Sequence, residues 1–473
     1  MLDARARNSD FVFQMKTRPE LQTPFSRNCD ILATFFAGLQ IVLATWLCSG
    51  VNAQFLFPMF AVAICAFGSA FGAGRFARDD VFSKTLSWSA LFFAAVCAVQ
   101  YLNPWARQLE FANFGGIEKL PYIKWLPTSV RAQFTDGGAA AAFCYLQTAF
   151  LTVLAFASMA EQSRRSRGFL YFFVLNAFAM GGFAVYQKAS GALSMYSLES
   201  LKGANFYGSF FLSNAAGAFL NMGVAAALAC AFLLAGRGWL AKLCAPVPLL
   251  AAAGMSYGVY DSESVGALYI CALVWTAFAL LLVLKILKRF FGIWACAVFA
   301  AAALAVGGYC ISENFEKIAE FAPQKKNDNA MHSAQSRLEI YKTVCPIILE
   351  RPIWGYGGES GDFVIPLLKG NDEKSVALAA SRAHSDLLGY LLDFGFAGGA
   401  VLAACGAAWL WRIWQMRRYL TCANAMCFVG AMSCFGHSLF DMELHIPSTM
   451  LMFGLMCVLS YAPIFGKEVD DEI

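Results

Sequence analysis

A short polar motif in the last third of the chain carries residues that could perform chemistry. Ser381-Arg382-Ala383-His384-Ser385-Asp386 leads directly into an apolar run, so we expect His384 where the chain enters a membrane helix. An imidazole there can act as a general base near neutral pH. Asp386 could cap that helix or orient the imidazole. The motif equally fits an interfacial histidine that is simply held by hydrogen bonds.

Arg337 offers a complementary cation. The segment Ser336–Glu339 has the Ser-x-x-Glu form of a capping box, and apolar residues including Tyr341 follow at every third or fourth position. This predicts a short helix that begins near Ser336 and is limited by Pro352. A guanidinium beside a helix N-terminus favours phosphate or pyrophosphate binding. A solvated arginine on a surface helix is the other interpretation.

Two further motifs carry weaker signals. The four glycines from Gly355 to Gly361 predict a tight loop with positive φ angles. The backbone amides of this loop, including that of Gly357, could approach an anion. The loop could equally be a plain turn. His437 and His445 flank Asp441 at a spacing that could suit a metal on a helix. A turn is expected to interrupt the helix there, so we predict no metal and a polar lining.

The elements that must position these residues are membrane helices. Hydrophobic residues make up 59% of the 473 positions and charged residues only 14%, whereas soluble domains carry roughly a quarter charged residues. This composition excludes a soluble enzyme, a disordered chain and a disulfide scaffold. Stretches long enough to cross a bilayer fall at roughly 31–50, 55–73, 86–102, 138–160, 169–187, 210–235, 243–259, 264–284, 292–311, 385–408, 423–440 and 446–465.

The loops between these stretches predict the topology. Lys and Arg are concentrated in the short loops of one side, which the positive-inside rule places in the cytoplasm together with both termini. We therefore expect an all-α polytopic membrane protein with about twelve transmembrane helices. Its parts are a cytoplasmic tail at 1–30, nine helices within 31–311, one large periplasmic loop at 312–384, three helices within 385–465 and a cytoplasmic tail at 466–473.

The motifs also stand in a characteristic order. Gly208-Ser209-Phe210 and Asn214 come first, Arg337 precedes a helix, and a Pro-x-x-Gly-x-Gly turn follows at 352–357. Ala383-His384-Ser385 then opens a span, and His437–Asp441 with Pro447 closes the set. This ordered set resembles the O-antigen ligase and O-antigen polymerase family of bacterial membrane glycosyltransferases, which includes pilin O-oligosaccharyltransferases.

The resemblance implies an activity and a site. Such enzymes move a saccharide from a polyprenyl-pyrophosphate carrier to an acceptor hydroxyl at the periplasmic face of the inner membrane, with no cofactor or metal. It implies that Arg337 stabilises the leaving pyrophosphate, that His384 activates the hydroxyl with Asp386 beside it, and that single displacement inverts the anomeric centre. Substrate contacts would come from Arg382, Lys202, Asn214, Tyr341, Gly355, Gly357, His437 and Asp441.

One departure from the family pattern matters. Members commonly carry Ser-Arg-Gly at the outer start of a middle span, where this chain reads Ser264-Val265-Gly266. Lys202, Arg382 or Lys188 would have to supply that positive charge, or activity would be reduced or altered. An inactive relative with a structural role is therefore one alternative.

The acceptor and the broader class also stay open at this stage. The acceptor could be a lipid A core, another lipid-linked repeat unit or a protein serine, which separates ligase, polymerase and protein O-oligosaccharyltransferase. A transporter or flippase is the alternative of a different class, since twelve spans with both ends inside fit many such proteins. Few ionisable residues lie near mid-membrane, which argues against coupled transport. Membrane lipids are expected partners, and nucleic acid is not.

Overall fold

The computed structural model describes residues 23–50, 53–74, 80–108, 117–134, 137–160, 163–198, 205–287, 324–368 and 382–464. Within these ranges the chain is mostly helical, and nine helices are long and apolar enough to cross a membrane. This agrees with a polytopic helical protein. The predicted ninth span at 292–311, Lys202, the tail at 466–473 and most of the tail at 1–30 lie outside the described residues.

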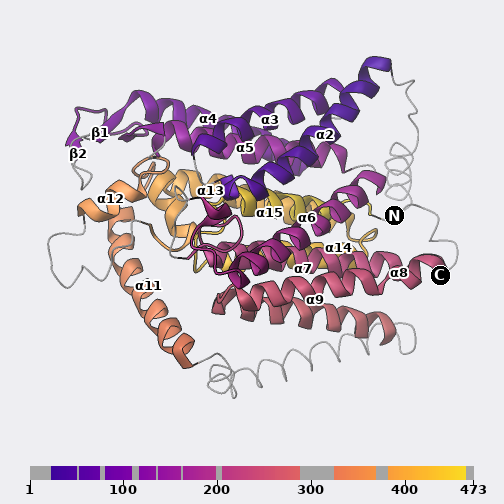
Figure 1. Ribbon diagram of the computed structural model, residues 1–473. Coiled ribbons are helices and arrows are strands. Elements are labelled where there is room, and N and C mark those ends of the chain that lie inside the picture. The colour runs from indigo at the N-terminus through magenta and orange to yellow at the C-terminus, as the bar shows by residue number, and fades with distance from the viewer. Residues whose placement is uncertain are drawn as a thin grey trace.

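Helices run along a common direction and form one bundle (Figure 1). The helices are α2 (Pro24–Trp46), α3 (Ala53–Gly72), α4 (Val81–Leu102), α5 (Gly138–Met159), α6 (Ser163–Ala189), α7 (Ser213–Ala235), α8 (Trp239–Cys244), α9 (Pro246–Asp261), Val265–Leu287, α11 (Gln324–Glu350), α12 (Gly361–Leu368), α13 (Asp386–Met416), α14 (Cys422–Ser438) and α15 (Pro447–Leu459), with single 3₁₀ turns at Cys48–Gly50 and Met195–Ser197. Each predicted span in the described ranges coincides with one of them. Among the helices that coincide with predicted spans, α15, α9 and α14 are the shortest, with 13, 16 and 17 residues.

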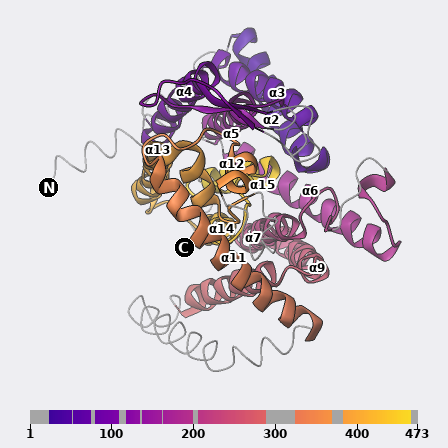
Figure 2. The ribbon, with the colours of Figure 1, turned by 90° about the vertical axis from the view of Figure 1, so that its left-hand side faces the viewer.

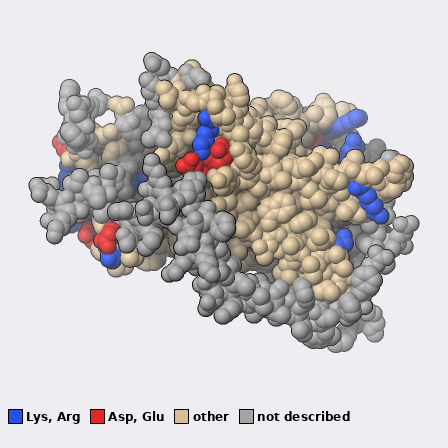
Figure 3. Space-filling model, turned by 60° about the horizontal axis from the view of Figure 1, so that its bottom comes forward, with Lys and Arg blue, Asp and Glu red and all other residues tan. Residues whose placement is uncertain are grey.

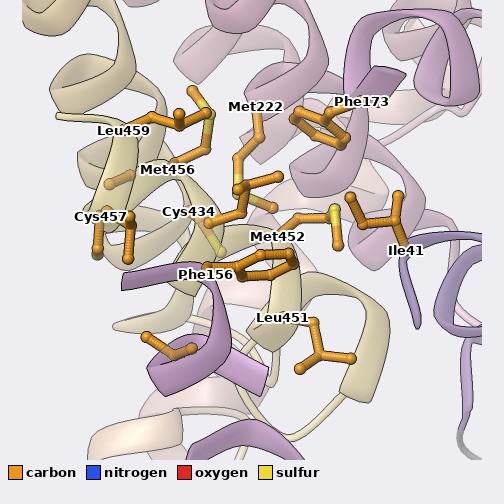
Figure 4. Close-up of a cluster of buried hydrophobic side chains, with 14 of the residues drawn as sticks. Ile41, Phe156, Phe173, Met222, Cys434, Leu451, Met452, Met456, Cys457 and Leu459 are labelled. Atoms are coloured by element: carbon orange, nitrogen blue, oxygen red, sulfur yellow. The ribbon is translucent and has the colours of Figure 1, made fainter. Parts of the chain in front are cut away.

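Helices α5 and α7 form the centre of the bundle. The most apolar stretch of α5 is 83% buried and that of α7 is 89% buried, against 11% for the helix Val265–Leu287. Methionine, cysteine and aromatic side chains of α5, α7, α14 and α15 meet in this core (Figure 4). Glycines allow the close approach, because a Cβ at Gly454 would lie 2.2 Å from Val153.

One end of the bundle, called the outer end below, carries the irregular structure. A small three-stranded sheet follows α4, in which β1 (Pro104–Gln108) pairs antiparallel with β2 (Ile117–Lys119) and parallel with β3 (Ser129–Arg131). The sequence did not predict this sheet, because its strands are only three to five residues long. Helices α11 and α12 lie at the same end, and α11 lies across it (Figures 1 and 2).

Three aromatic rings surround Arg351 and hold the sheet and the end of α11 together. Arg351, just after α11, lies over the rings of Trp105, Tyr122 and Tyr356 at 4.9, 5.1 and 4.5 Å and donates to the Tyr122 hydroxyl. Cation–π contacts of this kind contribute roughly 0.5–2 kcal/mol each. The sheet, the end of α11 and the following glycine turn are therefore held as one unit above the membrane helices.

Charge separates the two ends of the bundle. In Figure 3 a broad uncharged surface lies between a group of charged side chains and the basic side chains of the opposite end. Among the described residues, Arg164, Arg237, Lys242, Lys285 and Arg417 lie near the helix ends that are opposite the sheet. This pattern suits a bilayer-facing band with basic loops on one side.

Candidate functional site

Asp441 lies at the centre of a buried polar cluster at the outer end. It follows α14 in the turn that leads to α15 and is 3% exposed. Its Oδ2 accepts hydrogen bonds from Asn214 Nδ2 at 2.5 Å and from the Arg337 guanidinium at 3.0 Å, and its Oδ1 accepts from the Met442 amide at 3.0 Å. The imidazole Nδ1 of His384 lies 3.5 Å from the same Oδ1. We call Asn214, Arg337, His384 and Asp441 the Asp441 cluster.

The surroundings of Asp441 favour its charged form. Burial alone would raise its pKa, but the hydrogen bond with His384 and the charges of Arg337, His384 and His437 together hold the pKa of Asp441 below its ordinary value. The cluster therefore carries a stable carboxylate against which a cation and an imidazole are held.

Arg337 reaches this carboxylate from the middle of a long helix. The prediction that a helix begins near Ser336 is wrong, because α11 starts at Gln324 and continues through Ser336. Pro346 lies inside α11 without ending it, whereas the helix does end before Pro352 as expected. Arg337 is thus positioned by its ion pair with Asp441, with its side chain 27% exposed, and it does not lie at the N-terminus of its own helix.

His384 has an unusual backbone conformation. Its φ of +46° lies in the left-handed region, which costs an L-residue roughly 1–2 kcal/mol. The Tyr341 hydroxyl donates to the His384 carbonyl at 3.0 Å and supports this conformation. The imidazole is 34% exposed, and because Nδ1 faces Asp441, its Nε2 is the nitrogen left for an external group. Strained residues of this kind cluster at functional sites.

Asp386 does not contact His384, contrary to the expectation that it orients this imidazole. Its carboxylate pairs with His445 and accepts from the Leu444 amide at 2.6 Å. Tyr390 stacks on His445 with ring centroids 4.3 Å apart. Asp386 is also the first residue of α13, where the helix dipole favours an acid. The carboxylate beside His384 is that of Asp441, and the Asp386 amide donates to the Asp441 carbonyl at 3.1 Å, which holds the turn before α15 against the start of α13.

His437 and Glu443 form a second buried pair beside Asp441. His437 Nδ1 lies 3.5 Å from Glu443 Oε1, and neither this nitrogen nor either Glu443 oxygen has a hydrogen-bond partner among the described residues. Burial raises the pKa of Glu443 well above its ordinary value, and the charges of Asp441 and Asp386 raise it further, against the opposing charge of Arg337. These effects favour the neutral form of Glu443.

Asp441, His437 and Glu443 could in principle hold a metal, since their ligand atoms lie within 4.8 Å of one another. Both oxygens of Asp441, however, already accept from Asn214, Arg337 and the Met442 amide. A metal ion bound by Asp441 would also be repelled by the Arg337 guanidinium, which lies 3.0 Å from the same carboxylate. The donor set therefore fits a neutral polar lining better than a metal centre.

The glycine turn packs against α13 and does not present its amides to the outside. Gly355 and Gly357 have positive φ angles, as predicted, but their amides donate to the carbonyls of Arg351 and Asp393 at 3.0 and 2.9 Å. A Cβ on either glycine would come within 2.4 Å of neighbouring backbone atoms. The expected substrate contacts of these two glycines therefore become packing contacts.

Two other amides of this turn bind a carboxylate of the protein itself, that of Asp393. The amides of Glu359 and Ser360 donate to the Asp393 carboxylate at 3.0 and 3.3 Å. Helix α13 is distorted two residues later, at Gly395, where φ is +62°. An Asp within an apolar span and a Glu within a glycine turn were visible in the sequence, but their proximity was not.

The residues considered as substitutes for the family arginine have different positions. Lys188 pairs with Glu263 at 2.9 Å and with Asp261, directly before Ser264-Val265-Gly266. Arg382 pairs with Glu359 at 3.2 Å. Lys202 lies outside the described residues. Lys188 thus brings a cation close to the point where relatives place their arginine, although two acids accompany it.

Two cavities lie at the outer end of the bundle. A small polar one is lined by residues that include Glu359, Arg382, Asp393 and His445. A larger apolar one, of about 750 Å³, lies between the outer ends of α3, α4 and α5 and is lined by Phe57, Cys97, Tyr101, Leu102, Phe134 and Phe143 among others. The hydroxyl of Tyr145, which follows Cys144 in α5, lies 3.2 Å from the Tyr390 hydroxyl of α13.

Comparison with known proteins agrees with the resemblance. The model of the family described as O-antigen ligase matches residues 250–403. The matched range begins in α9 and ends in α13, and it includes Arg337, the glycine turn, His384 and Asp386. Asn214, His437 and Asp441 lie outside it. No curated protein matches the sequence.

Proposed function

Because residues 250–403 match the model of the O-antigen ligase family, we propose that this chain is a membrane glycosyltransferase of that type. It transfers a saccharide from a polyprenyl-pyrophosphate carrier to an acceptor hydroxyl. The reaction takes place at the periplasmic face of the bacterial inner membrane, with both termini in the cytoplasm. The basic residues at the end opposite the Asp441 cluster support this orientation.

The observation that carries the proposal is that Arg337 and His384 contact the same buried carboxylate. The two residues are far apart in the sequence, yet Asp441 lies 3.0 Å from one and 3.5 Å from the other. A cation for the leaving group and a base for the nucleophile therefore lie side by side. Both side chains are also partly exposed, so that a substrate can reach them.

The reaction follows from this geometry. The acceptor oxygen attacks the anomeric carbon and forms the new glycosidic bond while the bond to the pyrophosphate oxygen breaks. The hydroxyl proton passes to His384 Nε2, and the Asp441 carboxylate stabilises the resulting imidazolium through Nδ1–H. The polyprenyl pyrophosphate leaves with its negative charge facing the Arg337 guanidinium. A single displacement of this kind inverts the anomeric centre.

The remaining features fit a lipid-linked donor. The apolar cavity between α3, α4 and α5 has room for part of a prenyl chain, and its residues lie at the outer ends of membrane helices. Arg337 supplies the positive charge that a metal would otherwise supply, so the proposed transfer needs neither metal nor cofactor. Asn214 and Tyr341 act on Asp441 and on the His384 backbone, which makes them positioning residues in this proposal.

Complementation of a deletion strain tests the proposal. We expect loss of the glycan product and accumulation of lipid-linked saccharide, both reversed by the wild-type chain but by neither His384→Ala nor Arg337→Ala. Loss of a positioned base lowers rates about 10²–10⁴-fold, and loss of a charge-stabilising donor about 10²–10³-fold. Glu339→Gln, on the exposed face of α11, is the matched control and should complement fully. Full complementation by both site variants would refute the proposed site.

A further inference from the structure

Two imidazole–carboxylate pairs lie next to each other at the outer end, and the proposed reaction uses only one of them. His384 pairs with Asp441, and His445 pairs with Asp386. We infer that Asp386 and His445, called the positioning pair below, hold the Asp441 carboxylate at the distance from His384 that the transfer requires. The inference rests on the proposed function and deepens it, because it assigns a role in the reaction to two residues that touch no substrate.

The two pairs are crossed between the same two segments. The chain that enters α13 supplies His384 and Asp386, and the turn before α15 supplies Asp441 and His445. Each segment contributes one acid and one imidazole, and each acid pairs with the imidazole of the other segment. A displacement of one segment along the other would therefore disturb both contacts at once.

Asp386 binds the turn before α15 through three separate contacts. Its amide donates to the Asp441 carbonyl at 3.1 Å, and its Oδ2 accepts from the Leu444 amide at 2.6 Å. Its Oδ1 pairs with His445 Nδ1. Because these contacts reach both ends of the turn and Asp386 is two residues from His384, they also set how close His384 and Asp441 come.

Two tyrosines and a glycine hold His445 in its place. Tyr390 of α13 stacks on the His445 ring with centroids 4.3 Å apart and donates to the Leu444 carbonyl at 2.9 Å. Tyr145 of α5 donates to the same carbonyl. A Cβ on Gly389 would lie 2.8 Å from the His445 ring, so the absence of a side chain there allows α13 to approach it. The ring is thus fixed by two helices.

Exposure separates the positioning pair from the reacting pair. The side chains of Asp386 and His445 are 3% and 8% exposed, against 34% for His384. Burial alone would lower the pKa of His445, but the hydrogen bond with Asp386 and the charge of that residue raise it above its ordinary value, with smaller contributions from two further acids. The pair is therefore ionic and nearly closed, and its effect on the reaction passes through Asp441.

Kinetic measurements on the full-length protein in lipid nanodiscs test the inference. The donor is a polyprenyl-pyrophosphate-linked saccharide. The acceptor is whichever of a lipid A core glycolipid, a lipid-linked repeat unit and a serine peptide the wild type uses. We expect His445→Ala to lower kcat about 10- to 100-fold, since misplacing a catalytic group by about 1 Å has an effect of this size. KM should stay within about threefold, because the change removes no group that faces a substrate.

Two conservative variants sharpen this measurement. The amide nitrogen of His445→Asn can take the place of Nδ1 and donate to Asp386, so kcat should lie within about fivefold of the wild-type value. Asp386→Asn keeps the size of the side chain but loses one of its two acceptor oxygens. It should lower kcat in the same way as His445→Ala, and it replaces that variant if His445→Ala does not fold.

A double-mutant cycle separates positioning from a general loss of structure. In the Asp441→Asn protein, His445→Ala should lower kcat by no more than about threefold further, since both changes disrupt the same contact with His384. Independent structural damage would instead multiply the two effects. Asp80→Asn, which removes a buried carboxylate at the opposite end of the bundle, is the matched control and should leave kcat within about threefold in either background.

The wild type and the variants decide different questions. Multiplied effects in the cycle, a raised KM with unchanged kcat, or wild-type kinetics of both His445→Ala and Asp386→Asn would overturn the inference, while transfer by the wild type would still support the proposed function. Absence of transfer by the wild type to all three acceptors would refute the proposed function and, with it, the role of the positioning pair.

Discussion

The two ends of the bundle both contain buried carboxylates paired with arginine, yet they are built differently. At the basic end, Arg165 binds both oxygens of Asp30, and Arg412 lies 3.0 Å from Asp80, which also caps α4 through Ser83. At the outer end, Asp441 receives Arg337 together with Asn214 and an imidazole. Each pair at the basic end ties two helices, whereas Asp441 gathers groups from three other segments around one carboxylate.

Exposure separates the two arrangements further. The side chains of Arg412 and Asp80 are 11% and 7% exposed, so this pair is closed to external groups. Arg337 and His384 remain accessible while their carboxylate is buried. An Arg–Asp pair is therefore structural at the basic end and suited to catalysis at the outer end. Two features make the difference. Asp441 also contacts an imidazole and an amide, and its Arg337 and His384 partners are partly exposed to solvent.

The largest expected effect comes from comparing the two central carboxylates. Asp441→Asn should lower transfer about 10²–10³-fold or more, because it removes the charge that stabilises the imidazolium and holds Arg337. Asp80→Asn should leave transfer within about threefold. Rates measured at equal amounts of folded protein would test this. Equal transfer rates for Asp441→Asn and Asp80→Asn would show that Asp441 has no larger role in catalysis than Asp80.

A smaller effect is expected in stability. Asp30→Asn leaves Arg165 without its charged partner, and breaking such a pair costs roughly 3–5 kcal/mol when fully buried and less here, because Arg165 is partly exposed. We expect a lower Tm of the detergent-solubilised protein with unchanged transfer per folded molecule. The double variant Asp30→Asn/Arg165→Gln should recover part of the Tm. Loss of activity with an unchanged Tm would contradict a structural role.

The smallest expected effect is a pH dependence that distinguishes Glu443 from Asp441. Glu443 has a raised pKa in the folded chain, so its contribution to stability is fully present below the unfolded value of about 4.3 and is lost as the pH rises. Asp441 has a lowered pKa, so its contribution is present above about pH 3.9 and is lost as the pH falls.

The measurement is the Tm of the wild type and of Glu443→Gln between pH 5 and pH 8. An amide cannot ionise, so the variant should lack the wild-type decline with rising pH, whose slope is at most about 1.4 kcal/mol per pH unit. Parallel Tm profiles for the two proteins would show that Glu443 does not hold its proton in the folded chain.

The sequence predicted the membrane helices well because each membrane span is a long, uninterrupted run of apolar residues. The runs that became α5 and α7 are apolar on every side, and both helices are almost wholly buried. Short elements were predicted less well. The strands β1 to β3 are too brief to show a period. A capping-box pattern at Ser336 proved to lie inside α11, because two matching residues cannot outweigh a continuing helix.

By itself, the sequence determined the residue types available for chemistry, the membrane-spanning character and the family resemblance, since these depend on composition, periodicity and order along the chain. Only the tertiary structure decided which acid partners which base. Asp386, two residues from His384, turns to His445, while Asp441, which lies 57 positions further along the chain, approaches the imidazole. The reason is that a helix start fixes the direction of the side chains that follow it, whereas the packing of α11, α13 and the turn before α15 brings distant groups to one point.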